Sequence, residues 1–187
     1  EGARRYDEAW VDGAWGRLQI DRVLHDVPDQ ESLLVQAGLG EAKRALASAW
    51  EAGPGGPVVL VHADVHAANV LEVARHDDRV ELALIDLDRV GLAPVALDLT
   101  FALLEHADAT AWACLRGYRQ VRPLAADFER VYAAFRLLAT VDTLAFLAGF
   151  DREHGYVAAA WPGLVAACAA LTAPSALVVG RSSAPER

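Results

Sequence analysis

Two neighbouring stretches decide the fold of this chain, HADVHAANVL (62–71) and LIDLDRVGLAPVALDL (84–99). Both place acidic side chains, and the first also an amide side chain, next to apolar runs, which is typical of strand ends. The runs NVLEV (69–73) and VELALID (80–86) flank a short polar turn and therefore predict a β-hairpin. The run VVLVH (58–62) predicts one more short strand just before the first stretch.

The strand ends carry three side chains that suit one kind of chemistry. Asp64 follows the first predicted strand, Asn69 comes five residues later, and Asp86 ends the last strand. Strand ends that flank a common loop can bring these side chains into one cleft. A carboxylate and an amide oxygen are hard ligands that suit Mg²⁺ bound to phosphates, and a second carboxylate can deprotonate a hydroxyl nucleophile. The residues alone thus indicate phosphoryl transfer, which requires mainly positioning and charge neutralisation.

The rest of the chain has helical periodicity on both sides of the hairpin. Pro94 suits the first position of a helix, and Asp29 or Ser32 can cap an earlier one. The spacing of apolar residues predicts helices over 6–24, 29–52, 95–105, 109–119, 125–149 and 157–171. We therefore expect a mostly helical α+β fold, with one domain over residues 1–172 and a flexible tail over 173–187.

Composition narrows the class of protein and of partner. Of the 187 residues 54% are apolar, as in a globular chain, and the net charge of −9 argues against nucleic-acid binding. Cys114 and Cys168 are too few for a disulfide scaffold, so we expect a cytoplasmic protein. The uncharged segment 156–180 could span a bilayer, but its alanines and Pro162 favour a buried helix that stops before Pro174. We expect no nucleic-acid or membrane partner, and a monomer with a dimer as the alternative.

One compound pattern is specific enough to indicate a family. His-x-Asp-x-x-x-x-Asn, then a hairpin, then Ile-Asp-x-Asp resembles the catalytic and metal loops of aminoglycoside phosphotransferases and choline-kinase-like proteins. The resemblance covers about residues 57–104 and extends into the helices on both sides. It implies the C-terminal lobe of a protein-kinase-like fold. It also implies an enzyme that uses Mg²⁺ and ATP or GTP to phosphorylate a small hydroxylated molecule, such as a cationic amino alcohol or an aminoglycoside-like antibiotic.

The resemblance also implies roles for individual residues. Asp64 would be the catalytic base, while Asn69 and Asp86 would bind Mg²⁺ and, through it, the nucleotide phosphates. His66 falls where it can contact the transferred phosphate. Asp88 is either a further metal ligand or a local partner that caps the next segment or pairs with the arginine beside it.

Three more residues would support the site or border it. The resemblance implies that His62 braces the catalytic loop, and that Asp98, on the helix after Pro94, holds that loop through hydrogen bonds to its backbone. Asp142 lies on the apolar stripe of the predicted helix 125–149, where a carboxylate requires a partner or a cleft. It either lines an acidic substrate pocket or pairs with an arginine of a neighbouring helix.

Some features depart from the family pattern. Ala63 and Ala67 stand where the family usually has glycine and proline, so we expect a less constrained loop. No Gly-rich loop precedes the motif, and Lys43, the one lysine, falls in a helical pattern. We therefore expect that the nucleotide-gripping lobe is missing and that the isolated chain has little or no turnover. The chain also contains no methionine, so we expect that its first residue is not the start of the natural product.

Two other functions fit parts of the pattern. His62, Asp64 and His66 alternate, so on a strand they would face one way and could bind a transition metal with Asp86, as in a metal-dependent hydrolase. That hypothesis leaves Asn69 unexplained. The chain could instead be a non-catalytic, kinase-like binding module, although such a module has no chemical need for these acidic residues.

Overall fold

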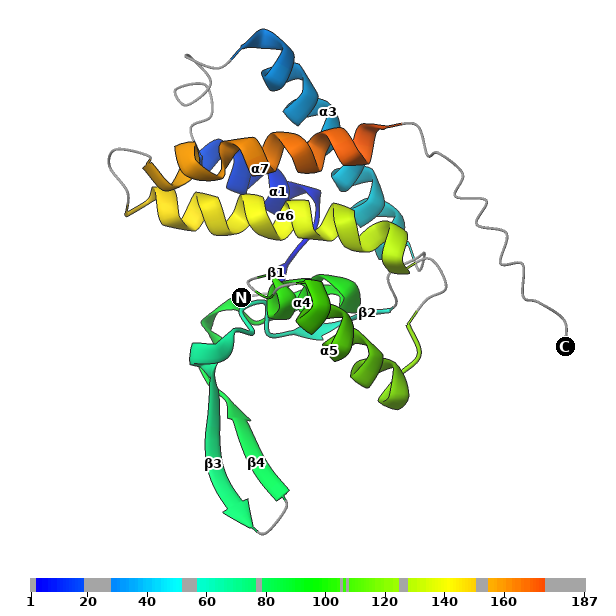
Figure 1. Ribbon diagram of the computed structural model, residues 1–187, viewed down its shortest axis with the longest axis vertical. Coiled ribbons are helices and arrows are strands. Elements are labelled where there is room, and N and C mark those ends of the chain that lie inside the picture. The colour runs from blue at the N-terminus through cyan, green and yellow to red at the C-terminus, as the bar shows by residue number, and fades with distance from the viewer. Residues whose placement is uncertain are drawn as a thin grey trace, which may run out of the picture.

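Helices make up most of the described chain, and the strands form two small sheets (Figure 1). The computed structural model describes residues 3–18, 28–51, 57–76, 79–104, 106, 108–124, 128–150 and 155–173. The helices are α1 (Glu8–Arg17), α3 (Asp29–Trp50), α4 (Val95–Leu103), α5 (Asp108–Val121), α6 (Phe128–Ala148) and α7 (Gly155–Thr172). Two single 3-10 turns are η2 (Ala67–Asn69) and η3 (Leu87–Arg89). The strands are β1 (Arg4–Arg5), β2 (Val58–Val61), β3 (Val70–His76), β4 (Arg79–Leu84) and β5 (Gly91–Pro94). The mostly helical α+β class predicted from the sequence is confirmed.

The predicted hairpin is present and consists of β3 and β4, which extend away from the helices (Figure 1). The two strands are antiparallel, and Val70 lies opposite Leu84. Large apolar side chains of the hairpin remain exposed, namely Leu71, Val73, Val80, Leu82 and Leu84. At its base the backbone N–H of Ile85 donates to the carbonyl of Asn69 at 3.0 Å. The hairpin therefore brings the two quoted stretches side by side.

A second sheet, in the order β1–β5–β2, was not predicted from the sequence. Strand β5 runs antiparallel to β2 and parallel to β1, with Arg4 opposite Gly91. Neither β1, with two residues, nor β5, with a glycine and a proline, has the alternation that identifies a strand. A Cβ on Gly91 would lie 2.6 Å from the carbonyl oxygen of Arg4, so glycine permits this close pairing. The sheet holds β2, and with it the loop over residues 62–69.

Helix α6 lies at the centre of the helical layer and contacts α1, α3, α4 and α7 (Figure 1). Its predicted apolar stripe is buried through Phe128, Val131, Phe135 and Leu138, whereas Phe146 of the same predicted stripe is 56% exposed. The stripe then continues into Asp142, which is 3% exposed. A carboxylate thus lies in the middle of the helix packing.

The start of α3 differs from the prediction. The helix begins at Asp29 itself, Pro28 occupies the N-cap position, and no side chain caps this end. The backbone N–H groups of Glu31 and Ser32 donate instead to the carbonyl of Pro28 at 2.9 and 3.2 Å. The carbonyl oxygen of Pro28 therefore accepts hydrogen bonds at this helix end, where the sequence suggested that a side chain would accept them.

Helix α7 packs on one face only, although the sequence predicted a buried helix. The buried face consists of Val157, Trp161, Leu164 and Cys168, which recur at helical spacing. Both α6 and α7 are long and apolar enough to cross a membrane by length and composition. The apolar segment Val131–Ala148 of α6 is 61% buried inside the protein, whereas the segment Gly155–Thr172 of α7 is 22% buried. The small alanine side chains explain the difference, because they make the other faces apolar without requiring burial. The predicted tail lies outside the described residues, apart from Ala173.

Candidate active site

The loop after β2 is held in place from two directions. The imidazole Nε2 of His62 contacts the carbonyl of Ile85 at 2.9 Å, and this histidine is 7% exposed. On the other side Asp98, in the first turn of α4, accepts a hydrogen bond from the backbone N–H of Ala63 at 2.8 Å. Both contacts are of the kind that the resemblance implies for these two residues. They tie the loop to the end of the hairpin and to α4.

Ala63 adopts a left-handed backbone conformation with φ of 59°, which explains why related loops have glycine there. We predict that Ala63→Gly changes the free energy of unfolding by less than about 1 kcal/mol, because relief of the strained φ offsets the added flexibility. Ala63→Val should destabilise the fold by more than about 2 kcal/mol, since a branched side chain is unfavourable at positive φ and the site is fully buried. Chemical denaturation of the three proteins measures this difference. Equal stability of the two variants would contradict the assigned backbone conformation.

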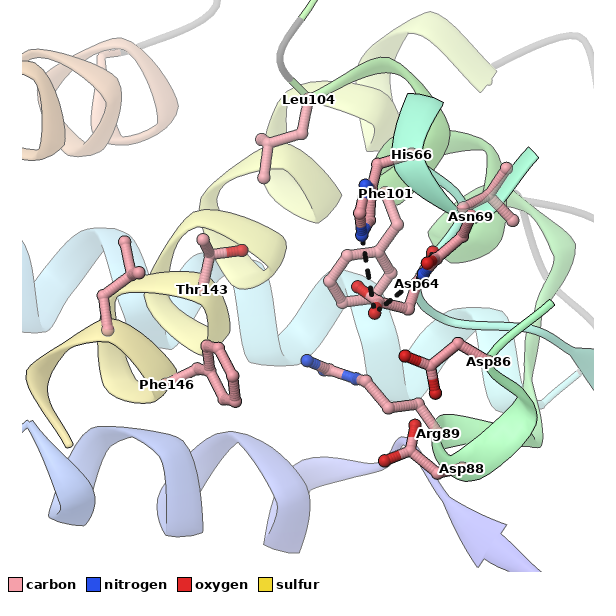
Figure 2. Close-up of a pocket in the computed structure, with 12 residues that line it drawn as sticks. Asp64, His66, Asn69, Asp86, Asp88, Arg89, Phe101, Leu104, Thr143 and Phe146 are labelled. Carbon is pink, nitrogen blue, oxygen red and sulfur yellow. Dashed lines mark hydrogen bonds and ion pairs between the residues drawn. The ribbon is translucent and has the colours of Figure 1, made fainter. Parts of the chain in front are cut away.

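The structure brings Asp64, His66 and Asn69 together on this loop (Figure 2). The amide Nδ2 of Asn69 donates to the backbone carbonyl of Asp64 at 2.9 Å and to its carboxylate Oδ2 at 3.2 Å. His66 places Nε2 3.8 Å from the same Oδ2, while its Nδ1 accepts from the N–H of Ala68 at 3.3 Å. Since Asn69 uses its nitrogen toward Asp64, its side-chain oxygen can serve a cation. The Asp64 carboxylate is thus oriented by its neighbours.

Asp86 also lies at the site, directly before η3. Its backbone is left-handed, with φ of 64° and ψ of 68°, and its carboxylate is exposed. A hydrogen bond with Asp88 and the negative charges of Asp88 and Asp64 raise the pKa of Asp86. A cation would relieve this repulsion. The donor set of Asp86, Asp88 and the oxygen of Asn69 therefore fits a hard divalent ion such as Mg²⁺.

These ligands form an open site and not a closed cage. In the part of the chain that the structure describes, no three His, Cys, Asp or Glu side chains converge as a metal-binding group. Mg²⁺ is usually held by one or two carboxylates, with waters and substrate phosphates completing its shell. The open arrangement therefore suits a metal that is shared with a phosphorylated ligand.

A cavity of about 460 Å³ runs from these carboxylates to α4 and α6 (Figure 2). Its polar wall contains Asp64, His66, Asn69, Asp86, Asp88 and Arg89. Its opposite wall is mainly apolar and consists of Phe101, Leu104, Thr143, Phe146 and Leu147. The site thus has charged groups at one end and an aromatic surface for a small molecule at the other.

The structure gives Asp142 protein partners. The indole Nε1 of Trp10 donates to its carboxylate at 2.9 Å, Arg17 lies 3.4 Å away, and Arg89 forms a second ion pair with it. A second cavity, of about 650 Å³, adjoins this cluster and shares Asp88 and Arg89 with the first one. Sequence reasoning considered Arg89 only as a partner of Asp88 and did not place it in the cavity wall. Arg89 pairs with Asp142, whereas the sequence suggested Asp88 as its partner.

The one lysine lies away from the site. Lys43 is in α3, as its helical pattern predicted, and pairs with Asp12 of α1 at 2.8 Å. Within the described residues the cationic side chain that lines the first cavity is therefore Arg89.

Comparison with solved structures shows the same fold in two kinases. The microcompartment-associated aminopropanol kinase is 24% identical, with a TM-score of 0.59, and the match covers 76% of this chain and 45% of that one. A choline/ethanolamine kinase family protein from Mesorhizobium loti is 19% identical, with a TM-score of 0.56, and the match covers 87% and 54% of the two chains. The chain thus spans about half the length of the kinases it resembles. Comparison with curated proteins gave no match.

The sequence of the chain identifies its family. The model of the phosphotransferase enzyme family (APH) matches residues 2–138, which include the catalytic loop, the hairpin and the aspartate at its end. The solved relatives with this fold are kinases, and the site combines an oriented carboxylate with an open cation site. The chain belongs to the phosphotransferase enzyme family, of the aminoglycoside phosphotransferase and choline-kinase-like type.

Proposed function

We propose that this chain is the catalytic lobe of an O-phosphotransferase that moves the γ-phosphoryl group of ATP or GTP to a hydroxyl group of a small molecule. The observation that carries the proposal is the Asp64 carboxylate, held by Asn69 at 3.2 Å beside the exposed carboxylates of Asp86 and Asp88. Phosphoryl transfer requires such an arrangement, with a base for the hydroxyl and a separate cation site for the phosphates.

Each residue then has a distinct task. Asp64 accepts a hydrogen bond from the acceptor hydroxyl, orients its oxygen, and takes its proton as the new P–O bond forms. Asp86 and the side-chain oxygen of Asn69 would hold Mg²⁺, with Asp88 as an additional carboxylate. When bound, Mg²⁺ would supply positive charge that offsets the negative charge developing on the phosphates. His66, close to Asp64, faces the transferred group.

The cavity favours a compact acceptor, such as an amino alcohol. The negative charge of Asp64 attracts an ammonium group, and the aromatic ring of Phe146 offers a second favourable contact for a cation. Asp142 does not contribute to this attraction, because Arg89 and Arg17 already pair with it. The solved relatives, an aminopropanol kinase and a choline/ethanolamine kinase family protein, make amino alcohols the first compounds to test.

The proposed enzyme works with a nucleotide-binding lobe. The exposed apolar side chains of β3 and β4 support this, because a second lobe could cover them. We expect a cytoplasmic enzyme, where ATP, GTP and Mg²⁺ are supplied, and little turnover from the isolated chain. The metal-hydrolase alternative has weaker support, because His62 is buried against the carbonyl of Ile85 and lies outside the cavity wall.

The test is product formation by the longest reading frame that encodes the chain, assayed beside the 187-residue chain itself. Each is incubated with Mg·ATP or Mg·GTP and a mixture of amino alcohols, aminoglycosides and sugars, and mass spectrometry identifies phosphorylated products. We expect an amino alcohol phosphate from the longer protein. A folded longer protein that neither binds Mg·nucleotide nor forms a product would refute the proposed function.

A further inference from the structure

Asp142 joins three parts of the fold at one buried point. It belongs to α6, and its donors come from α1 (Trp10 and Arg17) and from η3 (Arg89). The carboxylate is 3% exposed, so the cost of burying its charge must be met by partners inside the protein. Two guanidinium groups and an indole N–H meet that need. The role of Asp142 therefore depends on which parts of the fold these partners fix in place.

What it holds is the turn that carries the metal-binding carboxylates. Arg89 follows Asp86 by three residues, and its guanidinium group reaches from η3 toward α6 (Figure 2). On the way it lies over the ring of Phe101, with its central carbon 5.4 Å from the ring centre. The backbone carbonyl of Arg89 accepts a second tether, a hydrogen bond from the hydroxyl of Tyr6 at 2.5 Å. Both the side chain and the main chain of this residue are thus anchored.

Asp86 has a conformation that requires such anchoring. A non-glycine residue at φ of 64° is strained, and it keeps that conformation where its surroundings impose it. No side chain caps η3. The carbonyl of Ile85 is held by His62 on one side of Asp86, and Arg89 is held on the other. The carboxylate therefore lies between two fixed points.

We propose that Asp142 is a positioning residue that sets the metal-binding geometry of Asp86 through its ion pair with Arg89, with the Tyr6 hydroxyl as a second, weaker tether. This inference rests on the proposed function, since it takes Asp86 as a ligand of Mg²⁺. The Asp142–Arg89 ion pair then changes the affinity for the metal through the position of Asp86, without contacting the metal itself. Partners of metal ligands commonly change metal affinity by about 10- to 100-fold when they are replaced.

The experiment is a titration of the protein from the longest reading frame that encodes the chain with Mn²⁺, a spectroscopic substitute for Mg²⁺, with free Mn²⁺ measured by electron paramagnetic resonance. It is run without nucleotide and with a nonhydrolysable ATP analogue. Asp142→Asn keeps the shape of the side chain and removes its charge, while Tyr6→Phe removes one hydroxyl. We expect the dissociation constant for Mn²⁺ to rise about tenfold in Asp142→Asn and about threefold in Tyr6→Phe, in the manner of other outer-shell ligands. Tyr6→Phe keeps the test valid if Asp142→Asn does not fold.

The chain offers a matched control in Glu31→Gln. Glu31 of α3 accepts a hydrogen bond from the indole Nε1 of Trp161 at 2.9 Å, as Asp142 does from Trp10, but it does not border the candidate site. The melting temperature is measured for every variant. If the role of Asp142 were purely structural, Asp142→Asn and Glu31→Gln would both lower the stability, and neither would change the affinity for Mn²⁺. We expect a shift in affinity for Asp142→Asn and less than a twofold change for Glu31→Gln.

The outcomes separate the two proposals. If Asp86→Ala abolishes Mn²⁺ binding while Asp142→Asn and Tyr6→Phe bind Mn²⁺ like the unchanged protein, the positioning role is overturned and the proposed function stands. If the unchanged protein shows no binding that depends on Asp86, even with the nucleotide analogue, both proposals are overturned together.

Discussion

Replacing Asp64 by Asn is expected to lower kcat by about a thousandfold, with little change in the affinity for Mg·nucleotide. The asparagine keeps the shape of the side chain and still presents an oxygen to the amide of Asn69, so the loop geometry is retained. What is lost is the negative charge that orients the acceptor hydroxyl and takes its proton. General-base catalysis commonly contributes about 10² to 10⁴ in rate, and Asp64 is the carboxylate oriented for that task.

The measurement is the initial rate of phosphorylated product from the longest reading frame, for the unchanged protein and for Asp64→Asn. Asp12→Asn serves as the control. Asp12 of α1 is an exposed carboxylate that pairs with Lys43 of α3. This control should retain the full rate. A loss of less than tenfold in a folded Asp64→Asn protein would contradict the role of Asp64 as the base.

Replacing Gly38 by Ala is expected to destabilise the protein by about 2–3 kcal/mol, the upper part of the range of about 1–3 kcal/mol for adding atoms to a tightly packed interior. Helices α3 and α7 meet so closely at this residue that an added Cβ would lie 2.5 Å from the Cβ of Cys168 and 2.7 Å from its Cα. The obstacle includes backbone, so a change of rotamer does not relieve it and the helices must separate. Gly40 lies in the same helix, and the nearest side-chain atom to its added Cβ is at 4.0 Å. Gly40→Ala should therefore stabilise the protein by up to about 1 kcal/mol.

Two measurements check this pair of variants. Chemical denaturation compares their free energies of unfolding, which should change in opposite directions. The reaction of thiols with a disulfide reagent reports the separation of α7, because burial raises the pKa of Cys168 to about 11 whereas Cys114 is exposed. Cys168 should react far more slowly than Cys114 in the unchanged protein and considerably faster in Gly38→Ala. Equal stability of the two alanine variants would contradict the close packing of α3 against α7.

The hairpin and the catalytic loop could be predicted because their signals are local. Asp64, Asn69 and Asp86 follow or precede apolar runs that read directly as strands, and one hairpin brings them together. The family resemblance implied that Asp98 bonds to the backbone of this loop, and a hydrogen bond from the N–H of Ala63 to Asp98 is present. The sheet β1–β5–β2 could not be predicted in the same way. Its pairing depends on partners far apart in sequence and on a glycine that permits close approach.

By itself, then, the sequence determined the family, the hairpin and the acidic residues that the candidate site brings together, because strand alternation and motif spacing act within a few residues. Only the tertiary structure decided what Asp142 does. A buried carboxylate is stabilised by whichever donors folding brings to it, and those donors, Trp10 and Arg89, lie 132 and 53 residues away. The one-sided packing of α7 was settled in the same way, since an alanine-rich helix is apolar all round and its neighbours alone select the face that is buried.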